Sequence, residues 1–194
     1  MTIGTKSVLY GVHCFFIHPW FVAAAWWKLY GFPWDPRLWA AFFVHDIGYW
    51  GKPNMDGPEG EKHPFLGARI VGALFGEEWF WFCLLHSRYL AKKLNKQPSR
   101  LALADKLAIA IEPSWLYIPR ARATGELEEY LANARKANPN RIPNTEMAIA
   151  VSVLKRGAEI GDAWMWHKGL REYMRLWVAI HSDGRADEIT GERL

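Results

Sequence analysis

Six side chains able to ligate a metal lie in or beside apolar segments of this 194-residue chain. Burying imidazole and carboxylate groups is costly unless they are paired or bound to a cation. Apart from one adjacent pair, each of the six falls on a different segment, so we expect them to point inward together and to hold a metal. The six are His18, His45, Asp46, His63, His86 and Asp105.

The donor types narrow the choice of metal. Imidazole and carboxylate ligands suit iron, manganese, nickel, cobalt or zinc, whereas copper(I) and structural zinc favour thiolates. Cys14 and Cys83 are the only cysteines and lie far apart in apolar surroundings, which supports neither a disulfide nor a zinc-thiolate site. A reducing, cytoplasmic setting is therefore the expectation.

The elements that must position these residues are predicted to be helices. No stretch shows sustained strand alternation and no internal repeat occurs, so the predicted fold class is all-α, in one domain. Loops are expected at 31–36, 48–62, 120–125 and 138–144, and a frayed tail at 185–194. The expected helices cover 7–30 (in two pieces meeting near His18 and Pro19), 37–47, 65–75, 77–94, 99–112, 126–137 and, as one or two helices, 145–183.

The order His, His-Asp, His, His, Asp resembles the HD superfamily of metal-dependent phosphohydrolases. The resemblance covers about residues 13–113. It implies an HD-domain helical bundle over 1–194, with 114–194 a C-terminal helical extension packed on the same core. The matching segments are His18-Pro19-Trp20-Phe21-Val22-Ala23, Val44-His45-Asp46-Ile47-Gly48, His63-Pro64-Phe65-Leu66-Gly67-Ala68, Leu85-His86-Ser87 and Ala104-Asp105-Lys106-Leu107-Ala108.

The resemblance also implies a centre of two divalent metal ions. One ion would be held by His18, His45, Asp46 and Asp105. Asp46 would bridge to a second ion held by His63 and His86. The chain is similar to bacterial symmetrical dinucleoside tetraphosphate hydrolases through Ile111-Glu112-Pro113, and to the HD-GYP phosphodiesterases around 44–48.

One position departs from both groups, which usually carry Lys four residues after the motif histidine. Tyr49 stands there, and Lys52 in the following loop is the candidate replacement, so we class Asp46 and Lys52 as candidate catalytic residues. The implied reaction is hydrolysis of a phosphoester or phosphoanhydride in a nucleotide-like small molecule by a metal-activated water.

Basic residues near the motifs are candidates for binding the phosphate. Arg88, Lys92 and Lys106 follow closely on ligand positions, although a solvated helix face is the alternative. Trp50, beside the motif, is the candidate for stacking on a base. Glu59 and Glu61 suit a general acid or an extra ligand less well than a solvated loop.

Several alternatives stay open. His13 would replace His18 if the first helix were rotated, but we favour His18 and interpret His13, His167 and His181 as core residues. Some two-metal HD proteins resemble this layout and are mixed-valence di-iron oxygenases. A non-catalytic metal- or nucleotide-binding regulatory module is the other alternative, favoured by Tyr49.

Charge and hydropathy limit the partners. The net charge of +4 is spread along the chain, which fits a small anionic ligand and gives no footprint for a nucleic-acid duplex. Residues 7–27 carry no Asp, Glu, Lys or Arg and are long enough to span a bilayer, but imidazoles in mid-membrane are expensive. We expect a buried helix there and no membrane partner, and a homo-oligomer remains open.

Overall fold

The computed structural model describes residues 1–182, which form eleven α-helices and three short 3₁₀ helices. No strand occurs within these residues, so the all-α prediction is confirmed. The predicted tail at 185–194 lies outside the described residues. The helices are α1 (Ile3–Tyr10), α2 (His18–Tyr30), α3 (Pro36–Val44), η1 (Ile47–Tyr49), η2 (Gly60–Lys62), α4 (Pro64–Phe75), α5 (Glu77–Leu84), α6 (Arg88–Lys93), α7 (Arg100–Ile111), α8 (Ser114–Thr124), α9 (Glu126–Arg135), η3 (Pro139–Arg141), α10 (Thr145–Ile160) and α11 (Ala163–Ser182).

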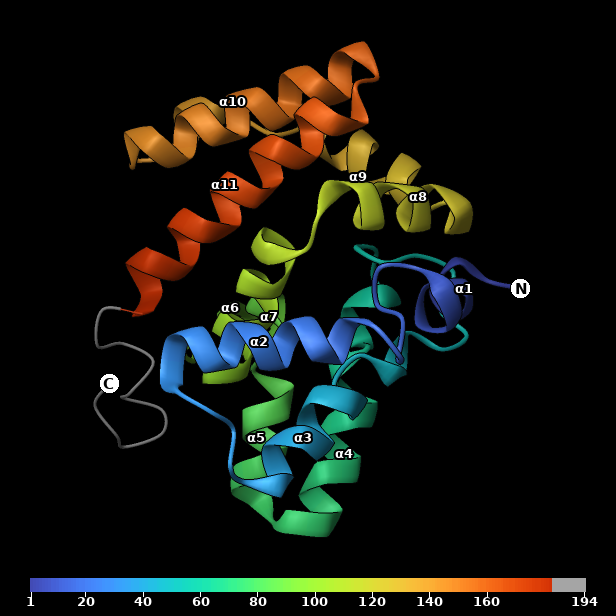
Figure 1. Ribbon diagram of the computed structural model, residues 1–194, viewed down its shortest axis with the longest axis vertical. Helices are drawn as coiled ribbons and strands as arrows, with labels where there is room; N and C mark the ends of the chain where they lie inside the picture. The colour runs from blue at the N-terminus through green and yellow to red at the C-terminus, as the bar shows by residue number, and fades with distance from the viewer. Residues whose placement is uncertain (183–194) are drawn as a thin grey trace.

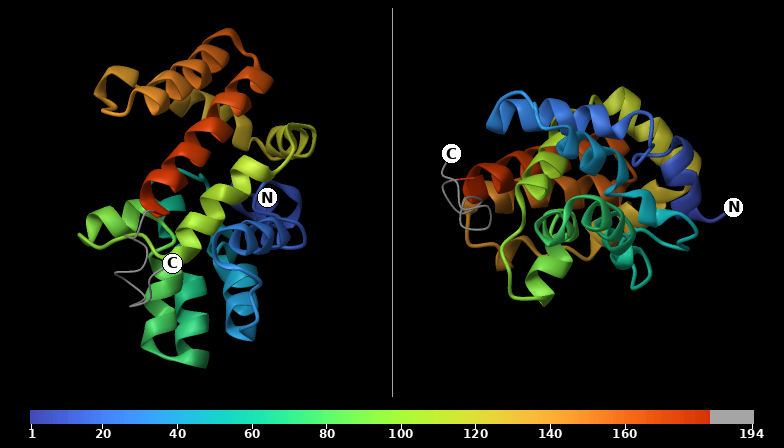
Figure 2. Two further views of the ribbon diagram at one scale, coloured as in Figure 1. Left: turned by 60° about the vertical axis from the view of Figure 1, so that its left-hand side comes forward. Right: turned by 90° about the horizontal axis from the view of Figure 1, so that it is seen from below.

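Helix α7 links the two parts of the molecule. It packs against α2 and against α11, the long helix that runs diagonally across Figure 1. Helices α2 to α7 gather around one hydrophobic cluster that includes Trp26, Phe42 and Leu101. Helices α8 to α11 gather around a second cluster that includes Ile118, Leu154 and Trp166. The views in Figure 2 show α10 and α11 packed together on the far side of α7 from α3 to α5.

Two helices that carry ligand residues end earlier than predicted. The helix expected over 37–47 ends at Val44, so His45 and Asp46 lie in the turn that leads into η1. The helix expected over 77–94 is broken at 85–87, between α5 and α6. Ser87 explains the break, because its side chain accepts a hydrogen bond from the backbone N–H of Leu90 and thereby starts a new helix.

The prediction of a loop at 120–125 was wrong. Helix α8 continues to Thr124 with Pro119 inside it, and the connection to α9 is Gly125, whose φ of 90° suits glycine. The side chain of Arg120 donates to the carbonyl of Leu116 one turn earlier, at 3.1 Å. The region expected to form one or two helices forms two, and α10 ends at its C-cap Gly161, whose φ is 75°.

The uncharged stretch at 7–27 is divided between α1, a series of turns and α2. Among the described helices, none has the length and hydropathy needed to cross a bilayer. Within α2, Val22 and Ala25 are fully buried, as expected for a helix that packs on the core.

Candidate metal centre

The six predicted ligands converge in the structure. They form two groups. Within each group the donor atoms lie within 4.8 Å of one another, and Asp46 belongs to both groups. All six side chains are buried. The first group is His18, His45, Asp46 and Asp105, and the second is Asp46, His63 and His86.

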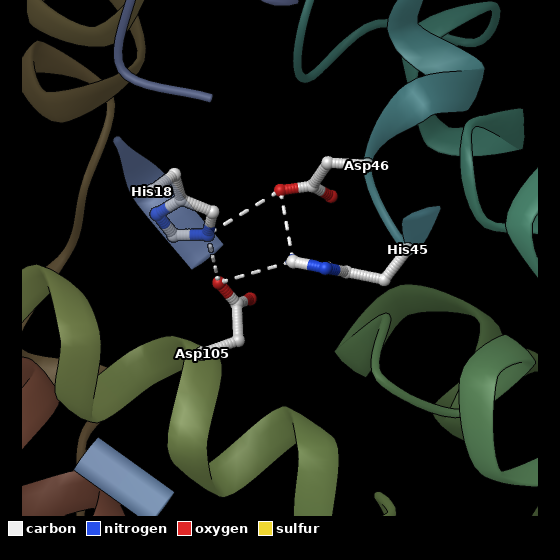
Figure 3. A group of neighbouring side chains, drawn as sticks. All are labelled: His18, His45, Asp46 and Asp105. Atoms are coloured by element: carbon white, nitrogen blue, oxygen red, sulfur yellow. Dashed lines mark hydrogen bonds and ion pairs between the residues drawn. The ribbon is translucent and has the colours of Figure 1, made fainter. Parts of the chain in front are cut away.

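Figure 3 shows the first group, whose members come from α2, the turn after α3, and α7. The Nε2 atom of His18 lies 3.0 Å from Oδ1 of Asp105 and 3.5 Å from Oδ2 of Asp46. The Nε2 atom of His45 lies 3.0 Å from the same Asp46 oxygen and 3.9 Å from Oδ1 of Asp105. Two nitrogens and two oxygens thus surround one point, which is the donor set of a cation site.

Asp46 connects this group to the second through its other oxygen. Its Oδ1 lies 3.4 Å from Nε2 of His63 and 3.3 Å from Nε2 of His86. The carboxylate therefore turns one oxygen toward each group. A carboxylate in this position can bridge two cations.

Backbone contacts orient three of the four imidazoles. The Nδ1 atoms of His45, His63 and His86 lie 2.9, 2.7 and 2.6 Å from the carbonyl oxygens of Phe42, Gly60 and Cys83. Because a carbonyl oxygen only accepts, each Nδ1 must carry the proton and donate it. The neutral form of each ring then presents the lone pair of Nε2 to the centre, as a metal ligand requires.

His63 and His86 give the strongest sign that a cation belongs here. Their Nε2 atoms lie only 3.1 Å apart. With both Nδ1 atoms donating to carbonyls, two neutral rings would face each other with lone pairs and no proton between them. Burial lowers the pKa of His63 well below its usual value, which disfavours a proton on that ring. A cation between the two nitrogens removes this repulsion.

The first group leaves polar atoms without partners. Nε2 of His45 and Oδ2 of Asp46 are buried and make no hydrogen bond of proper geometry, although they approach within 3.0 Å. Buried polar atoms without partners are rare in folded proteins and call for a ligand, an ion or a functional role. The residues therefore fit a resident metal.

The electrostatics favour charged carboxylates in the centre. Burial is the largest single influence on each pKa and favours the neutral acid, but the neighbouring groups together outweigh it. His45 with the other histidines at Asp46, and Lys106 with His18 and His45 at Asp105, hold the pKa of each carboxyl well below its usual value. Burial likewise opposes charge on His45, yet Asp46 and Asp105 raise its pKa to about 10. A divalent cation would compete with that proton for the same negative charge.

The local backbone places the ligands by close packing. A Cβ on Gly48 would overlap the backbone of His63, and a Cβ on Gly67 would overlap the carbonyl of Val44. Glycine at these two positions lets η1 and α4 approach the turn that carries Asp46. His86 lies in the break between α5 and α6, which allows its ring to fold back onto Cys83 and face inward.

A cavity of about 410 Å³ adjoins the centre. Arg88 and Lys106 line it, and the Nζ of Lys106 lies 2.7 Å from Oδ2 of Asp105. Most of the remaining wall comes from α8 to α11, including Tyr130 and Trp166. The C-terminal helices, which lie outside the HD resemblance, therefore shape the space next to the candidate ligands.

The other predicted functional residues lie elsewhere. Trp50, Lys52 and Lys92 are not among the described residues that line this cavity. Trp50 is exposed, and the backbone of Lys52 pairs with Gly4 of α1. Lys92 is exposed in the last turn of α6.

Two cavity residues were not predicted for a functional role. His13, interpreted as a core residue, lines the cavity and lies beside the first ligand group. Tyr49 also lines the cavity, and its ring stacks on His63 at 3.8 Å between centres. The sequence did carry a signal for a functional role of Tyr49, namely its position four residues after His45. It carries no local signal that separates His13 from a core histidine.

Comparison with protein-family models, curated proteins and solved structures finds no match for this chain. The HD resemblance therefore rests on the motif residues alone.

Proposed function

We propose that the protein is a two-metal phosphohydrolase of the HD type that cleaves a phosphoester or phosphoanhydride bond in a nucleotide-like small molecule. The observation that carries the proposal is the sharing of Asp46 between two buried ligand groups beside a cavity with cationic residues. Two bound divalent ions would supply charge stabilisation for the reacting phosphoryl group and lower the pKa of a water.

Lys106 and Arg88 are suited to hold the phosphate at the metal end of the cavity. Lys106 is fixed next to Asp105 by their ion pair. The guanidinium of Arg88 lies over the ring of Trp177, 5.1 Å from its centre, and 5.9 Å from that of Tyr173. This stacking restrains the Arg88 side chain. The N–H groups lie in the plane of the guanidinium, where they can donate to an anion.

The wall formed by the C-terminal helices suits a flat organic group. The rings of Tyr130 and Trp166 are nearly parallel, at 11° and 6.1 Å between centres. Asn133 and Asn138 add amide groups to the same wall, and an amide can both donate to and accept from the edge of a base. Aromatic faces combined with a few polar groups are typical of small-molecule sites.

Tyr49 changes how positive charge reaches the substrate. Its ring stacks on His63, and its neutral hydroxyl stands where the HD enzymes named above usually carry Lys. This position therefore supplies no cation to the substrate. Lys106 forms an ion pair with the first ligand group and takes this role in our proposal in place of Lys52.

The test is a screen of purified protein loaded with manganese, cobalt or zinc. Phosphate or nucleotide release is measured with nucleoside mono- and triphosphates, dinucleoside polyphosphates, cyclic dinucleotides and a chromogenic phosphodiester. Product formed by the wild type and lost in Asp46→Ala supports the proposal, and Glu172→Ala, on the surface of α11, is the matched control. No product from any substrate with any metal would contradict it and favour the regulatory module.

A di-iron oxygenase is the second candidate, because four imidazoles and two carboxylates also suit iron. Metal analysis of the protein as purified and an oxygen electrode decide between the two. Two tightly bound irons with oxygen consumption would favour the oxygenase.

A further inference from the structure

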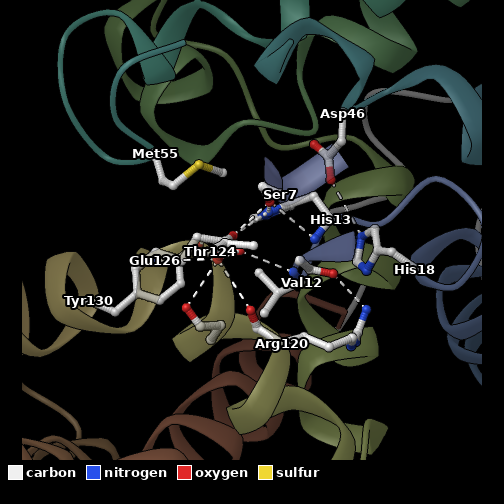
Figure 4. A network of polar contacts seen from close by, with 12 residues as sticks. Ser7, Val12, His13, His18, Asp46, Met55, Arg120, Thr124, Glu126 and Tyr130 are labelled. Carbon is white, nitrogen blue, oxygen red and sulfur yellow. Dashed lines mark hydrogen bonds and ion pairs between the residues drawn. The ribbon is translucent and has the colours of Figure 1, made fainter. Parts of the chain in front are cut away.

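Glu126, the first residue of α9, is fully buried and is surrounded by hydrogen-bond donors (Figure 4). Its Oε1 accepts from the hydroxyls of Ser7 and Tyr130 at 2.7 and 3.3 Å. Its Oε2 accepts from the backbone N–H of Val12 at 3.2 Å and the hydroxyl of Thr124 at 2.6 Å. So many donors around one carboxylate indicate that Glu126 is ionised.

His13 is the imidazole that contacts this buried carboxylate. Its Nδ1 lies 3.2 Å from Oε1 of Glu126 and 2.9 Å from the hydroxyl of Ser7. The guanidinium of Arg120 is nearby but donates to Glu112 and to the carbonyl of Gly11. The contacts with Glu126 and Ser7 therefore fix the orientation of the His13 ring, with Nδ1–H donated to the carboxylate.

The ring of His13 also belongs to the cavity. It lines the 410 Å³ space, with its centre 4.7 Å from that of Tyr49. It also borders a small void lined by His18, His45 and Asp46. Nδ1 is held by Ser7 and Glu126, so Nε2 is the ring nitrogen left for a ligand in the space that His13 lines.

We propose that His13 is a further catalytic residue that protonates the leaving group, and that Glu126 is its positioning residue. This inference rests on the proposed phosphohydrolase function. As water attacks phosphorus, the P–O bond to the leaving group breaks and its electron pair stays on the leaving oxygen. The Nε2 proton of His13 passes to that oxygen, the attacking water loses a proton to solvent, and His13 regains a proton from solvent after product release.

A leaving-group comparison tests this role. An alkyl phosphate needs a proton on its departing oxygen, whereas 4-nitrophenolate departs without one. With manganese-loaded protein, His13→Asn should reduce kcat for the alkyl ester by roughly 10²- to 10⁴-fold, the range of general acid catalysis. It should reduce kcat for 4-nitrophenyl phosphate by less than about 10-fold.

The Asn variant separates catalysis from packing. Its amide nitrogen takes the place of Nδ1 and can still donate to Glu126, so a purely structural role predicts near-wild-type rates for both esters. Equal losses for the two esters, or no loss, would overturn the proposal. His181→Asn, on α11 and outside the cavity lining, is the control histidine.

Glu126→Gln tests the positioning role. It should lower kcat for the alkyl ester more than for the 4-nitrophenyl ester while KM changes little, because the carboxylate acts through His13. An effect confined to thermal stability or to KM would show that Glu126 only supports the fold.

A binding measurement covers the case in which the wild type hydrolyses none of these esters. Inorganic phosphate is titrated into zinc-loaded protein labelled with ¹⁵N-histidine. A shift of one Nε2 resonance that is missing in His13→Asn supports a phosphate-facing imidazole even though hydrolysis has failed. Unchanged imidazole resonances would overturn the inference about His13.

Discussion

The backbone of His63 lies directly against Gly48, so closely that a Cβ on Gly48 would occupy the same space. This contact holds the two ligand groups next to each other, since Gly48 follows Asp46 by two residues. A methyl group at Gly48 would push the His63 backbone away from the shared carboxylate.

We predict that Gly48→Ala lowers the free energy of unfolding by about 1–3 kcal/mol, as overpacking does, and also lowers metal affinity. Urea unfolding and isothermal titration with zinc measure the two effects. Gly76→Ala is the control, because Gly76 has a φ of 99° and no neighbour within 4 Å. It should cost stability through backbone strain and leave zinc binding intact.

Metal stoichiometry should follow the two groups. His63→Ala should bind one ion fewer than the wild type because it removes a ligand of the second group only, and His18→Ala should do the same for the first group. Asp46→Ala should weaken both sites. Elemental analysis after desalting gives the counts, and a wild-type protein that binds fewer than two ions per chain would contradict the prediction.

Ser87→Ala should destabilise the protein by about 0.5–2 kcal/mol, because it removes the hydrogen bond that starts α6. It should also weaken metal binding, since His86 immediately precedes this cap. Ser99 occupies the same position before α7 but its side chain caps nothing. Ser99→Ala should therefore be close to neutral in the same unfolding assay.

The burial of His167 leads us to predict that the stability of the fold depends on pH. Burial, with Arg171 adding to it, lowers the pKa of His167 from 6.5 to about 3. The folded state keeps the ring neutral while the unfolded chain protonates it, so stability is full above pH 6.5 and is lost as pH falls toward 3. The slope attributable to this group approaches about 1.4 kcal/mol per pH unit.

His167→Phe should flatten that slope in denaturant unfolding measured between pH 4 and 7. The aromatic replacement retains stacking on Tyr117 and loses the hydrogen bond to Ser114. An unchanged slope in the variant would assign the acid sensitivity to other groups.

The grouping of the six candidate ligands was predictable because several of them are marked locally. His45-Asp46 follows an apolar helix, His63 precedes a helix-starting Pro64, and Asp105 lies in an apolar helix. The helix break at His86 was missed, since periodicity continues across it and Ser87 was not interpreted as an internal cap. The loop expected at 120–125 was wrong because α8 accommodates Pro119 and ends only at its C-cap Gly125.

The cavity could not be predicted in the same way. Its wall depends on contacts between residues far apart in sequence, such as Ser7 with Glu126, 119 positions apart. Nothing in the first turn of a polar helix indicates that a glutamate there turns inward to meet the N-terminal segment. Sequence periodicity reports which face of a helix is buried but not which distant segment covers it.

The wall built by α8 to α11 supplies none of the six candidate ligands, yet it encloses much of the cavity beside them. A chelator that approaches the ions through this cavity would have to pass residues such as Trp166 and Tyr130, which would slow its entry. How long an ion stays bound would then depend on the half of the chain that never touches it.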